Sequence, residues 1–423
     1  AYLGAVRALY GEGDKLARDL AYAAVMEKVA RDDPDDQEAA AFYALALLGT
    51  VRPADKGFRR QVQAGAIALE IYRKNPGHPG AAHYIIHAFD DPEHAILALP
   101  AARRYAEIAP EAHHARHMPS HIFLQLGMWP EAVASNESAW AASEAWVKRR
   151  NLPLNLRDYH SYHWLTYVYL QQGRYREART LVDRLRQTMR ESGRESVRHY
   201  DVTAAAFVVE TQRWDQAAAL FEPEAKAASA DAGEHAGHSA PQAVTRSSYR
   251  GQSVAPFVRS LAAAAGGAEG EFAALRAARP VGEAYGAKVA EIRELEVAAT
   301  AAAAKAAYEE ALKLMQRAAA LEEEMAPPSG PPTLVKPAHE LYGEILLRAG
   351  KPKEAAGQFK VALLRQPNRA RSLLGAARAA AQAGDRAAAS AAYSDLLRVW
   401  QRADPELPEL KEARDYVGQA SAR

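Results

Sequence analysis

The chain has 423 residues, of which 49% are hydrophobic and 25% charged, and it contains no cysteine. This composition excludes a mostly disordered protein, and the lack of cysteine excludes disulfides, thiolate nucleophiles and cysteine-ligated zinc. Because 53 Lys and Arg balance 52 Asp and Glu, the formal net charge of +1 predicts no nucleic-acid partner. Apolar stretches stay well short of the roughly 20 residues that cross a bilayer, so no membrane span is predicted.

Residues 1–222 are predicted to form an N-terminal block of helix hairpins. A turn glycine followed five residues later by an alanine occurs at Gly127 with Ala132 and at Gly173 with Ala178. In two-helix repeats such a glycine closes the turn, and the small residue lets the two helices pack closely. Residues 223–255, rich in Gly, Ser and Ala, predict an irregular linker.

Residues 256–326 predict a helical hairpin region that lacks a turn glycine, and residues 325–337 are dense in proline, which ends helices. The C-terminal block, 327–423, repeats with a period of 34 residues, as the spacing of Gly350 from Gly384 shows. No window alternates with period two. The sequence therefore predicts an all-α, right-handed superhelical array of antiparallel helix hairpins, an α-solenoid. In such an array a fragment ending at Met325 is expected to fold alone.

Ten of the 14 histidines lie between residues 78 and 163. Counted back from the turns at Asp90, Gly127 and Gly173, six of them occur at offsets of 3, 6, 7, 10 and 13 residues. These offsets follow the helical period, so the six are expected on the inner face of successive helices. They are His83, His87, His117, His121, His160 and His163. Two readings remain open, a converging site and a row of polar groove or core histidines.

Two neighbouring features bear on that choice. Pro119 lies between His117 and His121 and predicts either a helix start or a kink there. Asp90 and Asp91 could orient an imidazole or supply oxygen ligands. The alternative is that Asp-Asp-Pro simply forms a turn and starts a helix.

Four segments carry a resemblance to a known group of proteins: HPGAAHYIIHAFDDP (78–92), YAEIAPEAHHARHMPSHIF (105–123), YHSYHWLTYVYLQ (159–171) and KPAHELYGEILL (336–347). With these segments the chain resembles bacterial tetratricopeptide (TPR) repeat proteins that are mostly uncharacterised. The recurring histidines of that group match His78, His83, His87, His114, His117, His121 and His160. The resemblance implies a TPR fold, a helical region ahead of residue 1, and export slightly favoured over a cytoplasmic location.

The histidines predict a metal or acid/base site built from His87, His117, His121 and His160, together with His83. Imidazole ligands without thiolates suit Zn, Cu, Ni or Fe, and an open coordination position would admit a small molecule. The HExxH, GxSxG and phosphate-loop motifs are absent, so no nucleotide cofactor is expected and catalysis stays an open question. Metal affinity is expected to weaken as pH falls through about 6.5.

The alternative function is a non-catalytic scaffold that binds a peptide or protein segment. By the same count from Gly350 and Gly384, four charged residues face the groove of the C-terminal block: Glu340, Glu344, Arg371 and Arg378. They could contact a peptide or form ion pairs with one another inside the groove. Partner binding that persists after chelation would favour this alternative.

Overall fold

The computed structural model describes residues 1–52, 55, 57–192, 197–221, 254–268, 272–277 and 284–421. Within these residues the chain forms helices and no strand, so the predicted all-α array of helix hairpins is confirmed. The predicted linker at 223–255 lies outside the described residues except for its last two positions, and the domain boundaries stay a prediction. Among the described helices, none is both long and apolar enough to cross a membrane.

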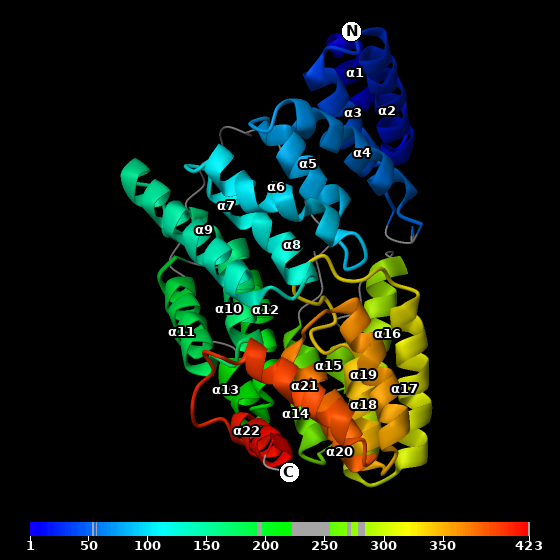
Figure 1. The fold of residues 1–423 in the computed structure, drawn as a ribbon, viewed down its shortest axis with the longest axis vertical. Coiled ribbons are helices and arrows are strands. Elements are labelled where there is room, and N and C mark those ends of the chain that lie inside the picture. Colours follow the sequence, from blue (N-terminus) through cyan, green and yellow to red (C-terminus); the bar gives the residue numbers. More distant parts are fainter. Residues whose placement is uncertain are drawn as a thin grey trace.

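The described helices follow one another with short turns (Figure 1). The first part comprises α1 (Tyr2–Leu9), α2 (Lys15–Asp32), α3 (Gln37–Gly49), α4 (Arg59–Lys74), α5 (Pro79–Ala88), α6 (Ala95–Ile108), α7 (His113–His117), α8 (Pro119–Gln125), α9 (Trp129–Arg150), α10 (Tyr159–Gln171), α11 (Tyr175–Ser192), α12 (Val197–Thr211) and α13 (Ala217–Leu220). The second part comprises α14 (Ala255–Ala265), α15 (Phe272–Ala277), α16 (Ala284–Ala304), α17 (Tyr308–Glu323), α18 (Ala338–Arg348), α19 (Pro352–Arg365), α20 (Ala370–Gln382), α21 (Arg386–Val399) and α22 (Pro408–Ser421).

The turns explain why the hairpins form where the sequence predicts. Gly127, Gly173, Gly350 and Gly384 all adopt positive φ, between 63° and 82°, a conformation that favours glycine. Between α16 and α17 this position is occupied by Ala306 at φ 59°. The hairpin without a turn glycine therefore closes in the same way, with a strained alanine in the glycine's place.

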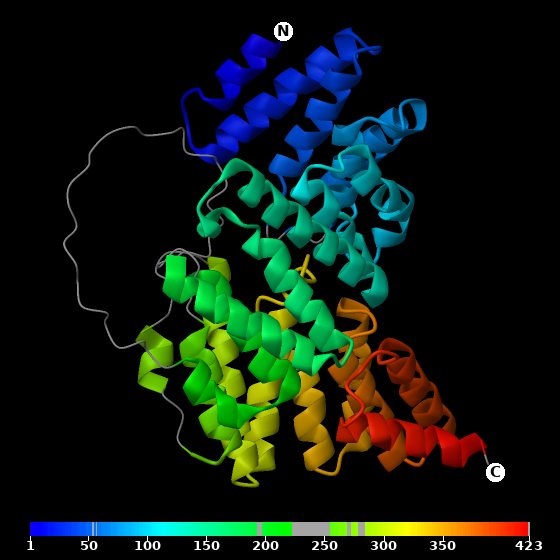
Figure 2. The same ribbon diagram turned by 90° about the vertical axis from the view of Figure 1, so that its left-hand side faces the viewer.

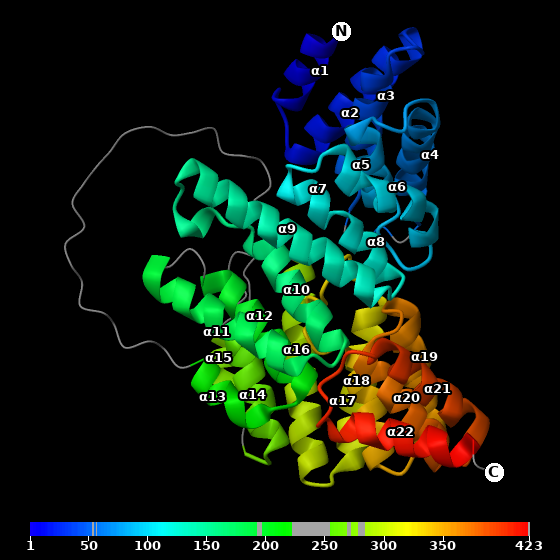
Figure 3. The same cartoon turned by 60° about the vertical axis from the view of Figure 1, so that its left-hand side comes forward.

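The inner helices of the second half form a closed ring. α10, α12, α14, α16, α18 and α20 contact one another in this order. α20 then returns to α10, where the Ala370 amide donates to Gln171 Oε1 at 3.0 Å. The segment between α21 and α22 lies against the end of α10 (Figure 3), with Trp400 Nε1 donating to the carbonyl of Gln171 at 3.0 Å. α1 to α6 project from this ring toward the N-terminus (Figure 2).

One buried guanidinium holds four elements of the ring together. Arg369, just before α20, is fully buried. It donates to both carboxylate oxygens of Glu340 on α18 at 2.8 and 3.0 Å and to Tyr167 on α10 at 2.9 Å. It also pairs with Glu210 on α12 at 2.7 Å. Lys336 adds a second cation at 2.9 Å from Glu340. The inner space of the ring is therefore filled by the chain's own charges.

The main hydrophobic core crosses the predicted domain boundary. It runs from Phe123 through α10, α12 and α14 to the C-terminal helices, ending at Ala413. Trp129 of α9 is buried and donates from Nε1 to the carbonyl of Asn368 at 2.9 Å. Gly173 sits so close to Ala403 that an added Cβ would lie 2.8 Å from it.

We expect Arg369→Met to lower the free energy of unfolding by about 3–5 kcal/mol, because Glu210 and Glu340 would remain buried beside an uncharged side chain. Arg398→Met is the matched control, since Arg398 is exposed and pairs only with Asp395 at 2.7 Å among its printed contacts. Urea unfolding measures both variants. Equal stability of the two variants would contradict the central role of Arg369.

The shared core also reverses the expectation for the fragment ending at Met325. Without α18–α22 the fragment loses the partners of Trp129, Gly173 and Tyr167, so we expect it to lack a cooperative thermal transition and to expose apolar surface. Near-ultraviolet circular dichroism and dye binding measure these properties. A fragment that melts as sharply as the full chain would show that the two halves are separable after all.

Candidate metal centre

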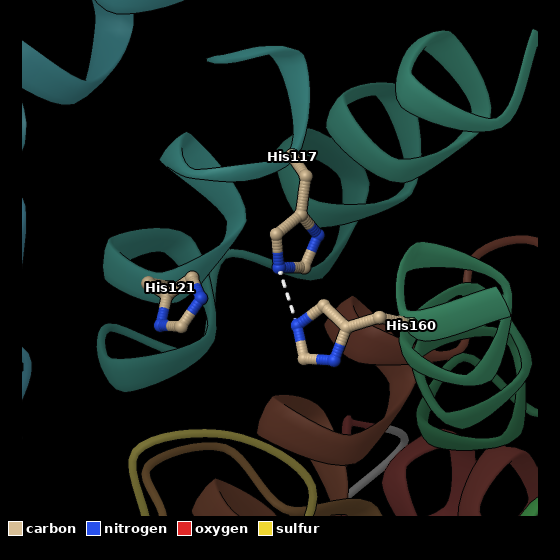
Figure 4. A group of neighbouring side chains, drawn as sticks. All are labelled: His117, His121 and His160. Atoms are coloured by element: carbon tan, nitrogen blue, oxygen red, sulfur yellow. Dashed lines mark hydrogen bonds between the residues drawn. The ribbon is translucent and has the colours of Figure 1, made fainter. Parts of the chain in front are cut away.

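Three histidines from three helices converge at the junction between α7, α8 and α10 (Figure 4). Within the described part of the chain, one ring nitrogen each of His117, His121 and His160 lies within 4.8 Å of the others. His117 Nε2 and His160 Nε2 are 3.0 Å apart. His117 is fully buried, the side chain of His121 is 12% exposed, and His160 is exposed, so the group opens to solvent on one side.

Local sequence signals place these rings. α7 ends at His117 and α8 begins at Pro119, so the predicted helix start at the proline is confirmed. His117 and His121 therefore stand on two consecutive short helices, with ring centroids 5.1 Å apart and ring planes at 79°. α10 starts at the N-cap Asp158, whose carboxylate accepts from the Ser161 amide at 3.2 Å. His160 thus falls in the first turn of α10.

Hydrogen bonds from the outer side fix the orientation of two rings. His117 Nδ1 contacts Asn136 Oδ1 at 2.8 Å, and the Asn136 amide nitrogen donates to the Ala132 carbonyl at 2.8 Å. Because Asn136 presents an acceptor, His117 carries its proton on Nδ1 and keeps a lone pair on Nε2. His121 Nδ1 contacts Asp90 Oδ2 at 2.7 Å, and Gln125 donates to Asp90 Oδ1 at 3.0 Å. Such outer contacts are typical of histidines that bind metal ions.

Asp90 and Asp91 divide the two roles that the sequence left open. Asp90 orients His121, as described above. Asp91 accepts from the backbone amides of Glu93 and His94 at 2.9 and 3.1 Å, which is the turn and helix-start role. His78, one of the recurring histidines, has a similar structural role, because its Nδ1 accepts from the Ala81 amide at 3.1 Å and caps α5.

The floor of the site is aromatic and comes from two distant parts of the chain. The ring of Trp164 lies 4.8 Å from His117, 4.4 Å from His121 and 5.5 Å from His160. Gly330 packs on Trp164 so closely that a Cβ would lie 2.4 Å from the indole. Gln125 donates to the Pro328 carbonyl at 2.9 Å. The proline-rich segment therefore does more than separate helices, since it supports the site from below.

Burial keeps the histidines of this region uncharged. It lowers the pKa of His121 to about 3 and that of His117 well below its usual range, and neighbouring imidazoles lower both further. Burial also raises the pKa of Asp90 to about 7, against the opposing effects of Gln125 and His87. Neutral imidazole is the form that binds metal, so these ligands stay competent below the pH of about 6.5 expected from the sequence.

The other predicted ligands lie beside the triad. His83 and His87 of α5 face each other, with Nε2 atoms 3.0 Å apart, and the ring of His87 lies 6.1 Å from that of His121. His163 does not join the group, contrary to the phase argument. Its Nδ1 lies 3.4 Å from Thr203 Oγ1, on the side where α12 packs against α10.

Sequence reasoning missed three residues. His114 contacts His83, and it lies 13 residues before Gly127, the same offset as His160 from Gly173, so the count could have found it. Trp164 was assigned to the core, and it is buried, yet it also faces the three ligands. Asn136 lies on the outer helix α9, and no signal in the sequence points to it.

The four charged residues of the C-terminal block are engaged in ion pairs within the chain. Glu340 is fully buried between Arg369 and Lys336, and Glu344 contacts Lys336 at 2.8 Å. Arg371 pairs with Glu409 at 3.4 Å, and Arg378 pairs with Glu412 at 2.6 Å. A peptide-binding role for these four residues stays a prediction, and a peptide would have to compete with these internal contacts.

The chain matches no known family and no curated protein sequence. Solved structures with a similar fold include the anaphase-promoting complex hetero-tetramer Cut9–Hcn1, with 12% identity and a TM-score of 0.32 over 99% of this chain and 57% of that one. The P58(IPK) TPR domain has 13% identity and a TM-score of 0.27 over 92% of this chain and 100% of that one. A monomeric mutant of IFIT1 with m7Gppp-AAAA has 12% identity and a TM-score of 0.41 over 99% and 80%. Identities this low bear on the fold alone. The absence of a nucleic-acid partner stays a prediction.

The lowered histidine pKa values predict acid sensitivity of the metal-free protein. The pKa of His83 is lowered to about 3 and that of His87 to about 4, chiefly by burial. The unfolded chain therefore binds protons first, and stability that is complete above about pH 6.5 is lost as pH falls toward these folded values. We expect His83→Gln to lose less thermal stability than the parent between pH 7 and about pH 4.5.

His113→Gln is the control with the opposite sign. A hydrogen bond to Asp158 raises the pKa of His113, so this residue stabilises the fold below about pH 6.5 and its contribution is lost as pH rises. Removing it should steepen the loss of stability in acid. Identical pH profiles for the two variants, measured by thermal unfolding after chelation, would contradict the assignment.

Proposed function

We propose that the chain binds a transition metal ion through His117, His121 and His160 and presents it to a small molecule. The observation that carries this proposal is the convergence of three ring nitrogens within 4.8 Å, from three helices. Zn or Cu suits a set of imidazoles best, and Ni or Fe is compatible with it. The proposal rests on the donor set and on the outer hydrogen bonds described above.

The spacing of the rings fits a bound ion. Metal–imidazole bonds are about 2.0–2.1 Å long, so two nitrogens on a tetrahedral ion lie roughly 3.3 Å apart. The 3.0 Å between His117 Nε2 and His160 Nε2 is close to this distance. Without an ion, one of those two nitrogens must carry a proton to make the contact favourable, which costs one ring its preferred tautomer.

The surroundings leave a coordination position for an exogenous ligand. Trp164 and the segment around Gly330 close one side, whereas His160 borders solvent on the other. When bound, the ion would polarise this ligand or lower the pKa of a bound water. The chain's own residues keep the imidazoles neutral, and Asn136 and Asp90 orient two of them. Acid/base work by further residues is not required for binding.

Metal content tests the proposal. We expect about one ion per chain at this site under metal-replete conditions, and loss of that ion in His117→Ala, His121→Ala and His160→Ala. Asp90→Asn, which weakens the outer contact of His121, should lower affinity by roughly 10–100-fold while leaving binding intact. Elemental analysis and competition with a chelator measure these effects.

His163→Ala is the matched control. His163 lies on the same helix as His160, three residues further on, but its ring contacts Thr203 instead of the triad. It should retain the metal of the parent. Unchanged metal content in all the triad variants, or loss of metal in the control alone, would disprove the site. A peptide or protein partner bound equally well before and after chelation would favour the scaffold alternative.

A further inference from the structure

We infer a second metal position on His83, His87 and His114, directly beside the triad of His117, His121 and His160. His83 Nε2 lies 3.0 Å from His87 Nε2 and 3.3 Å from His114 Nε2, so three ring nitrogens again converge. His83 and His87 come from consecutive turns of α5, and His114 comes from α7. This inference rests on the proposed function, because it extends the same histidine-lined surface.

The protons of the three imidazoles argue for a cation at this point. A neutral imidazole has one N–H and one lone pair, so each contact between two Nε2 atoms needs a proton on one of them. His83 Nε2 stands at the middle of two such contacts. It can donate to only one neighbour, or accept from both through a single lone pair. An ion coordinated by all three lone pairs removes this conflict, with each proton moved to Nδ1.

The ring of His83 is also held in place. It stacks on Tyr105 with centroids 5.4 Å apart and planes at 18°, and on Tyr84 at 5.9 Å and 24°. Tyr105 is itself buried on α6. His87 and His114 are exposed, so an ion can reach them from solvent. A fixed central ligand with two accessible partners is a plausible capture geometry in physical terms, since only the partners must adjust.

The two groups of histidines are adjacent. The ring of His87 lies 6.1 Å from that of His121, and the ring of His114 lies 6.4 Å from that of His117. Two ions held in this way would share one solvent-facing surface. A small anion with two donor oxygens, such as phosphate, could then coordinate both ions, as in other two-metal sites. The structure thus points to a dinuclear centre that binds a small oxyanion.

Copper binding to the full chain tests the second position. Chelator-treated protein is titrated with Cu²⁺ in the presence of a weak competing ligand, and bound copper is measured by elemental analysis and electron paramagnetic resonance. We expect two copper ions per chain in the parent, with a half-field signal from two coupled ions. The double variant His83→Ala with His114→Ala should keep one ion and lose the half-field signal.

Two further variants separate this inference from the proposed function. His117→Ala with His160→Ala should also keep one ion, now at the second position, and His163→Ala should keep both, with unchanged circular dichroism throughout. One ion in the parent that survives in His83→Ala with His114→Ala would overturn the second position and leave the triad. One ion that is lost only in that variant would overturn the triad instead. No bound copper in the parent would overturn both.

Phosphate provides the test of the ligand class. Adding inorganic phosphate to the copper-loaded parent should change the half-field signal, because a bridging anion alters the coupling between the two ions. The same addition should leave His83→Ala with His114→Ala without such a signal. An unchanged spectrum of the two-copper parent at saturating phosphate would overturn the oxyanion assignment.

Discussion

The pairing of Arg369 with Glu210 and Glu340 is the interaction on which the rest of the molecule depends. A row of helix hairpins has no intrinsic reason to close, because each hairpin needs only its neighbours. Here one buried guanidinium, through contacts with α10, α12 and α18, joins the beginning of α20 to helices about 160 to 200 residues earlier. A buried charge is costly unless it is paired, so the ring is stable only when all these helices are in place.

α10 transmits this constraint to the histidines. His160, Trp164, Tyr167 and Gln171 follow the helical period along one face of the helix. The first two residues belong to the candidate metal centre, and the last two contact Arg369 and Ala370. A single rigid helix therefore fixes one ligand and the aromatic floor of the site relative to the ionic centre of the ring. The site is built on the best-supported element of the chain.

The sequence predicts the local parts of this arrangement and fails where distant segments meet. Turn glycines such as Gly127 locate the hairpins because positive φ is a local requirement. The histidine count finds His117, His121 and His160 because helix periodicity is local too. The same count places Glu340 on an inner face without showing that the ring fills that face. It also misdirects His163, whose ring turns toward a helix that the count cannot see. Asn136 is invisible for the same reason.

The contact between Gly330 and Trp164 has a consequence for synthesis of the chain. All six histidines of the two groups have left the ribosome before residue 165, whereas the floor under Trp164 is added only after Gly330 emerges. A nascent chain would therefore expose its imidazoles, without their completed support, while about half of the remaining polypeptide is being made. Domains generally fold as they emerge from the N-terminus. Any ion captured during that interval would meet a looser set of ligands than the finished protein offers, so the selectivity of the centre would be decided at the end of translation.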